Sequence, residues 1–278
     1  MSLFISSLNS GSNGNCYYVG NNNEAVLIDA GISCRETERR MLSLGLDINR
    51  VRAIFISHEH TDHISGLSVL SKKYQLPVYI TENTFLNSRL TIDQQLIIPL
   101  KAGIQITIGD IKVSAFPKFH DGCDPHSFVV ASDTVKVGVF TDIGMVCDNL
   151  IEHFKECHAA FLEANYDEQM LENGRYPYYL KNRIRNGKGH LSNNQALQLC
   201  LDHQPAFMSH LFLSHLSKDN NCPDLARALF LKNLNNMEII IASRYEPTSV
   251  YHINPPIEKL YSKPIGKEKK KVAQLTLF

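Results

Sequence analysis

The chain has 278 residues, enough to bury the core of one large domain or of two smaller ones. Its 28 basic residues equal its 28 acidic residues, which excludes a globally basic nucleic-acid-binding protein but not a local basic patch. Seven scattered cysteines without a Cys-x-x-Cys pair favour reduced thiols in a cytoplasmic protein. No uncharged stretch reaches the roughly 18 residues that span a bilayer, so we expect no membrane segment.

The first part of the sequence alternates short apolar stretches with small polar residues. Two predicted strands flank a glycine-rich turn at residues 10–16, which is either an ordinary hairpin connection or a phosphate cradle; taken alone, it favours the hairpin. Residues 24–28 have the pattern of a buried strand that ends in Asp29. Ser33 and Glu36 then form a capping-box pattern, which predicts the start of a helix.

Four potential metal ligands follow the apolar strand at residues 53–56. They are His58, His60, Asp62 and His63, and imidazole nitrogens with a carboxylate oxygen suit zinc, manganese or iron. A solvated loop is the alternative, but three histidines in six residues between apolar stretches favour a metal site. Alternation along the extended part points the first two histidines the same way, while the other two ligands follow a bend. The spacing therefore predicts one pair for each of two ions.

Further candidate ligands follow a change in the apolar pattern. Residues 97–139 alternate with a period of two, which predicts an antiparallel meander. His120 stands at a strand end, His126 lies six residues later, and Asp142 ends the next strand. One of the two histidines is expected to complete the site.

Three polar residues of the second half also stand at the boundaries of predicted elements. Glu163 ends a strand, His190 precedes a helix, and His215 ends a strand predicted at residues 206–214. Strand ends at one edge of an α/β sheet are where such folds place their sites.

The segment at residues 174–188 contains five basic residues and three tyrosines. Cations interleaved with aromatic rings fit a groove that follows a phosphate backbone, because tyrosines stack on bases. A solvated loop with tyrosines packed below is the alternative, and proximity to the metal site favours nucleic acid. The expected nucleic-acid contacts are Arg175, Tyr178, Lys181, Arg183, Arg185 and Lys188.

The pattern His-x-His-x-Asp-His resembles the signature of the metallo-β-lactamase-like hydrolases. This resemblance implies a four-layer αββα sandwich and two divalent ions, zinc or manganese. Only 215 − 142 = 73 positions separate Asp142 from His215, too few for the inserted cap domain of the long RNA-processing members. The resemblance assigns His58, His60 and His120 to one ion, Asp62, His63 and His215 to the other, Asp142 as the bridge, and Asp29 as a support behind the metal loop.

Further motifs narrow the resemblance. The Glu163 and His190 segments are similar to motifs of the tRNA 3′-processing branch, in which the glutamate orients a histidine that protonates the leaving oxygen; Asn165 replaces a threonine of that pattern. The whole set most resembles the WalJ/YycJ-like subfamily, regarded as bacterial DNA exonucleases that act from the 5′ end, and includes Ser-Gly-Ser-Asn-Gly-Asn-Cys, Glu-Ala-Asn-Tyr-Asp, Gly-His-Leu-Ser-Asn and His-Leu-Ser-x-x-Asn-Asn.

The sequence thus predicts a two-metal phosphodiesterase of DNA repair or replication, with Asp62, Glu163 and His190 as catalytic residues. Two alternatives are a small-molecule hydrolase of the same fold, such as a thioesterase or lactonase, and a non-catalytic adaptor. The apparently complete ligand set argues against the adaptor.

The composition changes at residue 262, where a lysine-rich stretch follows the expected domain at 1–261. We expect residues 262–278 to form a mobile tail. Its end resembles the peptide that binds the bacterial sliding clamp, which implies partner contacts by Gln274, Leu275, Leu277 and Phe278.

Overall fold

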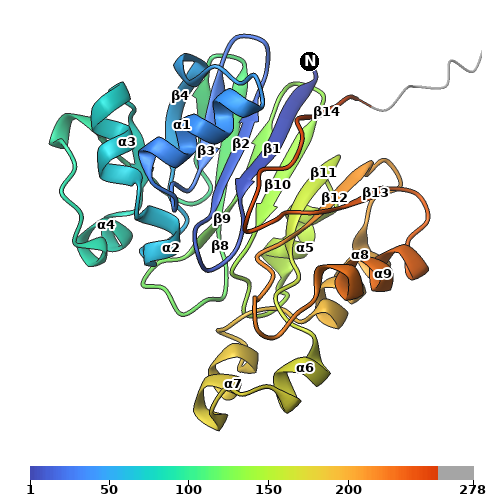
Figure 1. Ribbon diagram of the computed structural model, residues 1–278. Helices are drawn as coiled ribbons and strands as arrows, with labels where there is room; N and C mark the ends of the chain where they lie inside the picture. Colours follow the sequence, from blue (N-terminus) through green and yellow to red (C-terminus); the bar gives the residue numbers. More distant parts are fainter. Residues whose placement is uncertain (256–278) are drawn as a thin grey trace, which may run out of the picture.

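The computed structural model describes residues 1–255, so the expected boundary at 261 and the whole tail lie outside the described residues. A first seven-stranded sheet has the order β14-β1-β2-β3-β4-β5-β6 (Figure 1). The chain enters it through antiparallel neighbours and continues through parallel ones from β3 onward. Its strands are β1 (Leu3–Asn9), β2 (Cys16–Gly20), β3 (Ala25–Ile28), β4 (Val51–Phe55), β5 (Val78–Ile80), β6 (Ile97–Pro99) and β14 (Tyr251–Ile253).

The second sheet also has seven strands, in the order β13-β12-β11-β10-β9-β8-β7. The meander β7 to β10 is antiparallel, whereas β10 to β13 run parallel with helices between them. Its strands are β7 (Gln105–Ile108), β8 (Ile111–Pro117), β9 (His126–Ala131), β10 (Lys136–Phe140), β11 (Ala159–Glu163), β12 (His210–Ser214) and β13 (Glu238–Ile241).

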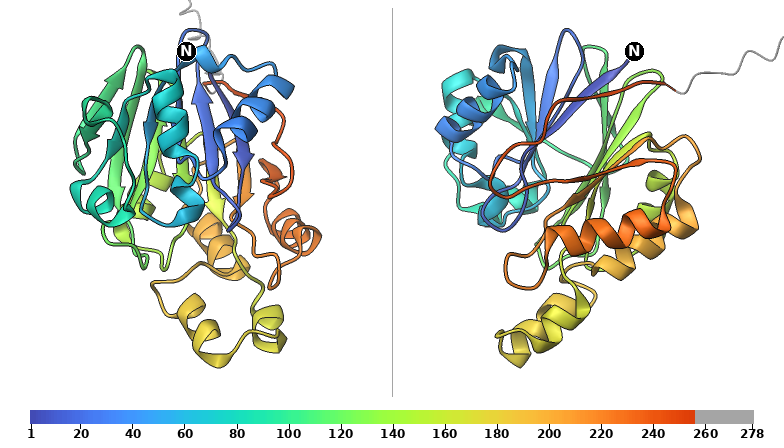
Figure 2. Two further views of the ribbon diagram at one scale, coloured as in Figure 1. Left: turned by 60° about the vertical axis from the view of Figure 1, so that its left-hand side comes forward. Right: turned by 45° about the vertical axis from the view of Figure 1, so that its right-hand side comes forward.

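The two sheets pack face to face and helices cover their outer faces (Figure 2). Between the sheets lies an apolar layer that includes Ile5, Val26, Phe128 and Phe161. Alternate residues of the same strands point outward and pack under helices, because side chains alternate across a strand. The helices are α1 (Cys34–Ser43), α2 (Thr61–Ile64), α3 (Leu67–Tyr74), α4 (Glu82–Ser88), α5 (Asp148–Phe154), α6 (Glu168–Asn173), α7 (Tyr178–Arg185), α8 (Asn193–His203) and α9 (Pro223–Asn233).

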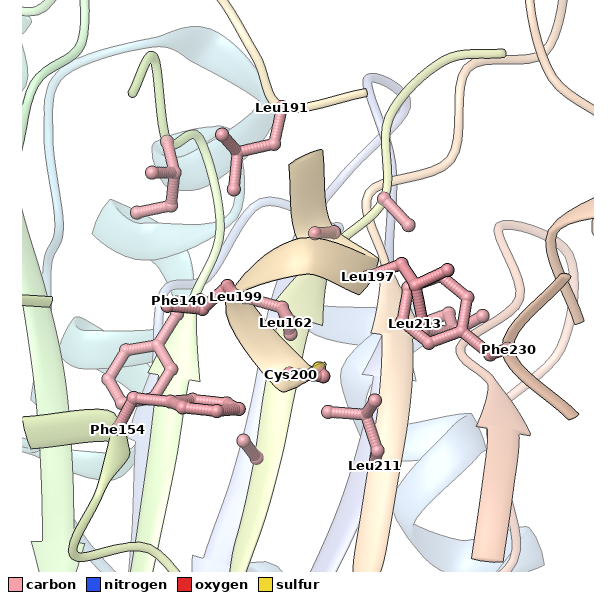
Figure 3. Packing of buried hydrophobic residues seen from close by; sticks show 14 of the residues in the cluster. Phe140, Phe154, Leu162, Leu191, Leu197, Leu199, Cys200, Leu211, Leu213 and Phe230 are labelled. Carbon is pink, nitrogen blue, oxygen red and sulfur yellow. The ribbon is translucent and has the colours of Figure 1, made fainter. Parts of the chain in front are cut away.

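Helix α8 illustrates how the outer layer is held. Leu197 and Cys200 of this helix pack with Leu162 and Leu213 of the sheet and with Phe230 of α9 (Figure 3). All five are nearly or completely buried. Burying such side chains contributes roughly 1.5–3 kcal/mol for each large apolar residue, which fixes the helix and the loop before it.

The predicted αββα sandwich without an inserted cap domain is confirmed. Between residues 142 and 215 the two short helices α6 and α7 project from the body of the molecule (Figure 1). All seven cysteines are free, and none of the helices within residues 1–255 is long and apolar enough to cross a bilayer.

Three details of the predicted elements were wrong. Residues 97–99 do not belong to the meander, because β6 pairs in parallel with β5 in the first sheet. The strand before His215 begins at His210, four residues later than expected. Ser33 caps α1 by accepting from the amide of Glu36, whose carboxylate binds arginines instead of completing a capping box.

Candidate metal centre

The predicted ligands lie in loops that leave the two sheets at one edge. β4 ends at Phe55, and the loop after it carries His58 and His60 before α2 presents Asp62 and His63. These positions belong to the first sheet.

The remaining ligands come from the second sheet. His120 follows β8, Asp142 follows β10, and His215 follows β12. The strands β10, β11 and β12 are parallel in register, so their carboxyl ends meet at one edge. Glu163, the last residue of β11, lies between the loops of its two neighbours.

The side chains converge in two groups whose donor atoms lie within 4.8 Å of one another in each group. We call His58, His60 and His120 the first group, and Asp62, His63 and His215 the second group. Both sets consist of the nitrogen and oxygen donors that divalent metals use.

Asp142 lies between the two groups. Its Oδ2 is 3.1 Å from His63 Nε2, and its Oδ1 is 3.4 Å from His215 Nε2 and 3.7 Å from His120 Nε2. Oδ2 is buried, and within residues 1–255 it forms no well-aligned hydrogen bond besides its approach to the His63 ring. An unsatisfied buried carboxylate oxygen is costly in a folded protein, and a cation between the groups would satisfy it.

His126, the second choice for the third histidine, is not part of any ligand group among the described residues. Its amide donates to Ser57 O, and its Nδ1 lies 2.9 Å from the carbonyl of Asp124. The structure therefore brings His120 to the first group and leaves His126 in the supporting strand.

The outer ring nitrogens of the ligands have fixed partners. His58 Nδ1 lies 2.9 Å from Ser57 Oγ, and His120 Nδ1 lies 2.9 Å from the carbonyl oxygen of Gly189. His215 Nδ1 is 3.3 Å from Glu163 Oε1. Such partners hold the ring orientation and keep the lone pair of the other nitrogen directed at the centre.

Asp29 lies behind the metal loop, where the family resemblance implied it would lie. Its Oδ1 accepts from the amide of Ser57 at 2.8 Å, and its Oδ2 accepts from Ser57 Oγ and lies 2.7 Å from His63 Nδ1. The side chain of Asp29 is completely buried. One carboxylate thus fixes both the loop backbone and a ligand of the second group.

Three residues of this centre have backbone angles that side chains rarely adopt. Asp29, Asp142 and His215 have φ of 62°, 54° and 56°, in the left-handed region. Each directly follows a strand or lies two residues beyond one. Such conformations cost free energy and persist where surrounding contacts determine them, which is typical of functional sites.

The two groups differ in their electrostatics. Burial lowers the pKa of His120 to about 4 and, with the charge of His63, holds the pKa of His58 well below its usual value. Burial also opposes protonation of His63, but the charges of Asp142, Asp29 and Asp62 outweigh it and raise the pKa of His63 to about 10. His58 and His120 are therefore neutral and ready for a metal, whereas a cation beside His63 would displace a proton.

Glu163 and His190 form a pair beside both groups. Glu163 Oε1 lies 2.8 Å from His190 Nδ1, while its Oε2 accepts from the amides of Ile143 and Leu191. The carboxylate is completely buried, but the imidazole is partly exposed and lines a cavity of about 540 Å³. Asp62, Asp142 and the three histidines of the ligand groups nearest the opening also line this cavity, namely His60, His120 and His215.

This fold and site agree with known proteins. The family model described as "Beta-lactamase superfamily domain" matches residues 24–215, more than half of the chain. The chain belongs to this superfamily. It is 40% identical over 232 residues to exodeoxyribonuclease YycJ of Bacillus anthracis, which covers 82% of this chain and 87% of the relative.

Two further relatives of the superfamily extend the comparison. Exodeoxyribonuclease WalJ of Streptococcus pneumoniae is 32% identical over 89% of this chain and 93% of its own length. The solved structure of the metallo-β-lactamase fold protein YhfI from Bacillus subtilis has a TM-score of 0.72 at 16% identity, covering 90% of this chain and 99% of that protein, and supports the fold alone. The resemblance to the WalJ/YycJ-like subfamily is thereby confirmed.

The predicted nucleic-acid contacts lie on the projecting α6–α7 segment of this superfamily member (Figure 2). Arg183 lines the cavity of about 540 Å³ beside the ligand groups, and its Nε and Nη2 both lie 2.6 Å from Asp121 Oδ2. Arg185 pairs with Glu172 at 2.8 Å, and Lys181 donates to the carbonyl of the same residue.

The other predicted contacts are freer. Arg175, Tyr178 and Lys188 are exposed, and the side chains of Arg175 and Lys188 form no hydrogen bond or ion pair with any described residue. The segment thus contains both cations available to a ligand and cations already engaged within the chain.

The sequence did not single out Asp121 or Asn15. Asp121 Oδ1 lies 3.5 Å from His60 Nε2 and is buried without a hydrogen-bond partner among residues 1–255. Asn15 Nδ2 lies 3.2 Å from Asp62 Oδ2 and 3.1 Å from His63 Nε2. The acidic residue directly after His120 was a usable signal. No comparable signal pointed to Asn15, because a turn of small polar residues has the same sequence pattern whether it is exposed or, as here, buried.

Proposed function

We propose that this protein is an exodeoxyribonuclease that uses two divalent ions, zinc or manganese, and removes nucleotides from the 5′ end of DNA. The observation that carries the proposal is the 40% identity to exodeoxyribonuclease YycJ across 87% of that relative. The convergence of two donor groups around Asp142 supports the use of two ions. The 5′ polarity rests on the subfamily resemblance.

Each group would hold one ion, with Asp142 between them. Bound divalent ions supply an activated water nucleophile and neutralise charge on the scissile phosphate. Asp29 orients the ligand His63 through its outer nitrogen, and Asp121 Oδ1 lies 3.5 Å from His60 Nε2 and 3.3 Å from His120 Nε2. These contacts make the geometry of the centre independent of the substrate.

The Glu163–His190 pair would protonate the leaving oxygen. Glu163 holds His190 by Nδ1, so Nε2 is the nitrogen available to the cavity. From this position Nε2 can pass a proton to the departing alkoxide. The buried carboxylate cannot turn away, because two backbone amides fix its other oxygen.

The α6–α7 segment provides cations and an aromatic ring beside the catalytic cavity. The exposed Arg175 and Lys188 can contact phosphates, and the exposed Tyr178 can stack on a base. Arg183 lies at the cavity itself and is partly neutralised by Asp121. A strand that follows this segment would reach the metal centre.

The deciding experiment is degradation of DNA labelled at the 5′ or the 3′ end, with Mn²⁺ or Zn²⁺ added. Stepwise release of the 5′ label, absent in His58→Ala, is the expected result. Endonucleolytic products or loss from the 3′ end would correct the polarity. Absence of cleavage of DNA and RNA by protein that contains two ions would overturn the nuclease and favour a small-molecule hydrolase.

We also propose that the C-terminal residues bind the bacterial sliding clamp. This proposal rests on the sequence Gln274-Leu275-Thr276-Leu277-Phe278, which lies outside the described residues. Deleting 274–278 should abolish clamp binding and leave hydrolysis of a short oligonucleotide unchanged. A scrambled pentapeptide is the matched control, and clamp binding that survives the deletion would refute the proposal.

A further inference from the structure

A second cavity of about 200 Å³ adjoins the catalytic one. The two cavities share Leu216 and Ser217, which directly follow the ligand His215. On its other side the second cavity is bounded by residues 241–245, at and after the end of β13. The two cavities are therefore neighbours on either side of the segment that follows His215.

Arg244 lines this cavity, and one nitrogen of its guanidinium lacks a partner. Its Nη1 is buried and has no hydrogen-bond acceptor in the described part of the chain. Its Nη2 donates to Ser12 Oγ at 3.2 Å, and Ser12 lines the catalytic cavity. A buried guanidinium N–H without an acceptor is unfavourable, and the planar fork of arginine matches the oxygens of a phosphate.

The surroundings of Arg244 favour an anion. No aspartate or glutamate is among the described residues that line the second cavity, and Lys218 adds an exposed ammonium at its edge. Asp219, the acidic neighbour in sequence, is bound instead by the hydroxyl of Tyr176 at 2.9 Å. Two cations without a lining carboxylate produce a positive potential in this cavity.

Other residues add the features of a nucleotide site. The hydroxyl of Ser217 can donate to a phosphate oxygen, and Tyr245, 65% exposed, offers an aromatic face for a base. The combination of guanidinium, ammonium, hydroxyl and exposed ring is the chemistry that a nucleotide unit needs.

The cavity is also preorganised. The carbonyl of Arg244 accepts from Asn13 Nδ2 at 2.8 Å, and the carbonyl of Tyr245 accepts from the buried Arg40 at 2.9 Å. Ser10, whose amide donates to Ser243 O, also accepts from the amide of His215 through its hydroxyl. The same loop thus fixes the Arg244 segment and a metal ligand relative to each other.

We propose that the Arg244 cavity binds a phosphate of the DNA strand at a position other than the scissile one. The inference rests on the proposed nuclease function and names a second binding subsite for its substrate. The phosphate is either an internal phosphodiester or the terminal phosphate of the strand. In both cases the subsite positions the strand relative to the two ions.

The test uses single-stranded oligodeoxynucleotides made resistant to hydrolysis by phosphorothioate linkages. One phosphate at a time is replaced by a neutral methylphosphonate, and a parallel set carries or lacks the 5′-terminal phosphate. Affinity for the intact protein, Arg244→Gln and Arg244→Lys is measured by fluorescence anisotropy. Arg52→Gln, an exposed arginine near the start of β4, is the matched control.

We expect Arg244→Gln to weaken oligonucleotide binding by about tenfold. At one phosphate, replacement by methylphosphonate should lower the affinity of the intact protein but not that of Arg244→Gln. Loss of sensitivity at the terminal phosphate identifies the end of the strand; loss at an internal position identifies a phosphodiester. Arg244→Lys should have an affinity between those of the intact protein and Arg244→Gln, because lysine retains the charge but lacks the planar guanidinium.

Two outcomes would overturn the inference. If Arg244→Gln binds every oligonucleotide like Arg52→Gln while the intact protein still degrades DNA, the subsite is wrong and the nuclease function stands. If the intact protein neither binds nor degrades DNA, the subsite and the proposed function fall together. Thermal unfolding of each variant distinguishes a lost contact from a lost fold.

Discussion

Replacement of His190 by alanine distinguishes two possible roles of this residue, donation of a proton to the leaving group and binding of a metal ion. Its Nδ1 is held by Glu163 at 2.8 Å, and that carboxylate also accepts from two backbone amides and lies 3.3 Å from Nδ1 of the ligand His215. None of the outer-nitrogen partners described for the five histidines of the two ligand groups is His190. His190→Ala should therefore remove the imidazole and leave the metal centre in place.

The expected loss of activity follows from the proposed role of His190 as a general acid. A positioned general acid contributes about 10²–10⁴-fold, which corresponds to about 2.7–5.4 kcal/mol of barrier. The loss should appear in kcat with a smaller change in KM, because Nε2 meets the leaving oxygen only as the bond breaks. Glu163→Gln retains a hydrogen-bond partner for Nδ1 but removes the charge, so its loss should be smaller.

The assay compares two substrates. A DNA strand has an alkoxide leaving group that needs a proton, whereas a nitrophenyl ester of thymidine 5′-phosphate has a leaving group that departs as a stable anion. His190→Ala should impair the first and largely spare the second. Metal content per chain, measured by inductively coupled plasma mass spectrometry, should equal that of the intact protein.

The structure also defines the refuting result. Asp142, Glu163, His190 and His215 offer donor atoms within 4.8 Å of one another, so His190 is close enough to bind an ion. If His190→Ala loses one ion per chain and impairs both substrates equally, His190 is a ligand and not the acid. An unchanged rate on DNA would exclude both roles.

Three further predictions concern the surroundings of the centre. A Cβ at Gly31 would lie 1.7 Å from the carbonyl oxygen of Asp62; Gly31→Ala should therefore displace that loop and weaken the second ion, and an unchanged metal titration would contradict this. Asp121→Asn should lower the affinity for the ion of the first group by about 10–100-fold in a competition titration with a chelator, because it removes a carboxylate beside the ligand His60. Asp133→Asn, which changes an exposed aspartate, is the control. Arg39 and Arg40 lower the pKa of Glu36 from 4.5 to about 2, so its contribution to the free energy of unfolding is present above pH 4.5 and lost as the pH falls through 2. Glu36→Gln should be less stable at neutral pH and lose less stability between pH 4.5 and 2 in urea titrations, and parallel curves for the two proteins would refute this.

The sequence predicted the metal loop because its ligands are adjacent in the chain. His58, His60, Asp62 and His63 lie within six residues, and an apolar strand precedes them. Local pattern also predicted that the other ligands follow strands, since a strand end needs no knowledge of the strand's neighbours. The choice of His120 over His126 required the resemblance, because both residues border strands.

Contacts between distant segments could not be predicted in this way. Arg183 was expected to meet DNA, and the additional contact of its guanidinium with Asp121, 62 positions earlier, was not predicted. The glycine-rich turn does join the antiparallel strands β1 and β2, as predicted, but the approach of its Asn15 to Asp62, 47 positions later, was not predicted. The sequence shows that these side chains are polar, and only the packing of the sheets determines which polar group each one meets.

The backbone of the centre shows why the local sequence is insufficient. Aspartate and histidine occur in the left-handed region more often than most residues, but each still bears the steric cost of its Cβ there. His215 keeps this conformation because Ser10 Oγ accepts its amide hydrogen at 2.7 Å and the outer nitrogen of its ring lies beside Glu163. Asp142 follows Thr141, whose carbonyl is bound by the buried Lys118. The free energy that holds the ligands in strained positions thus comes from segments far away in the chain, so the centre is a product of the tertiary structure even though its motif is local.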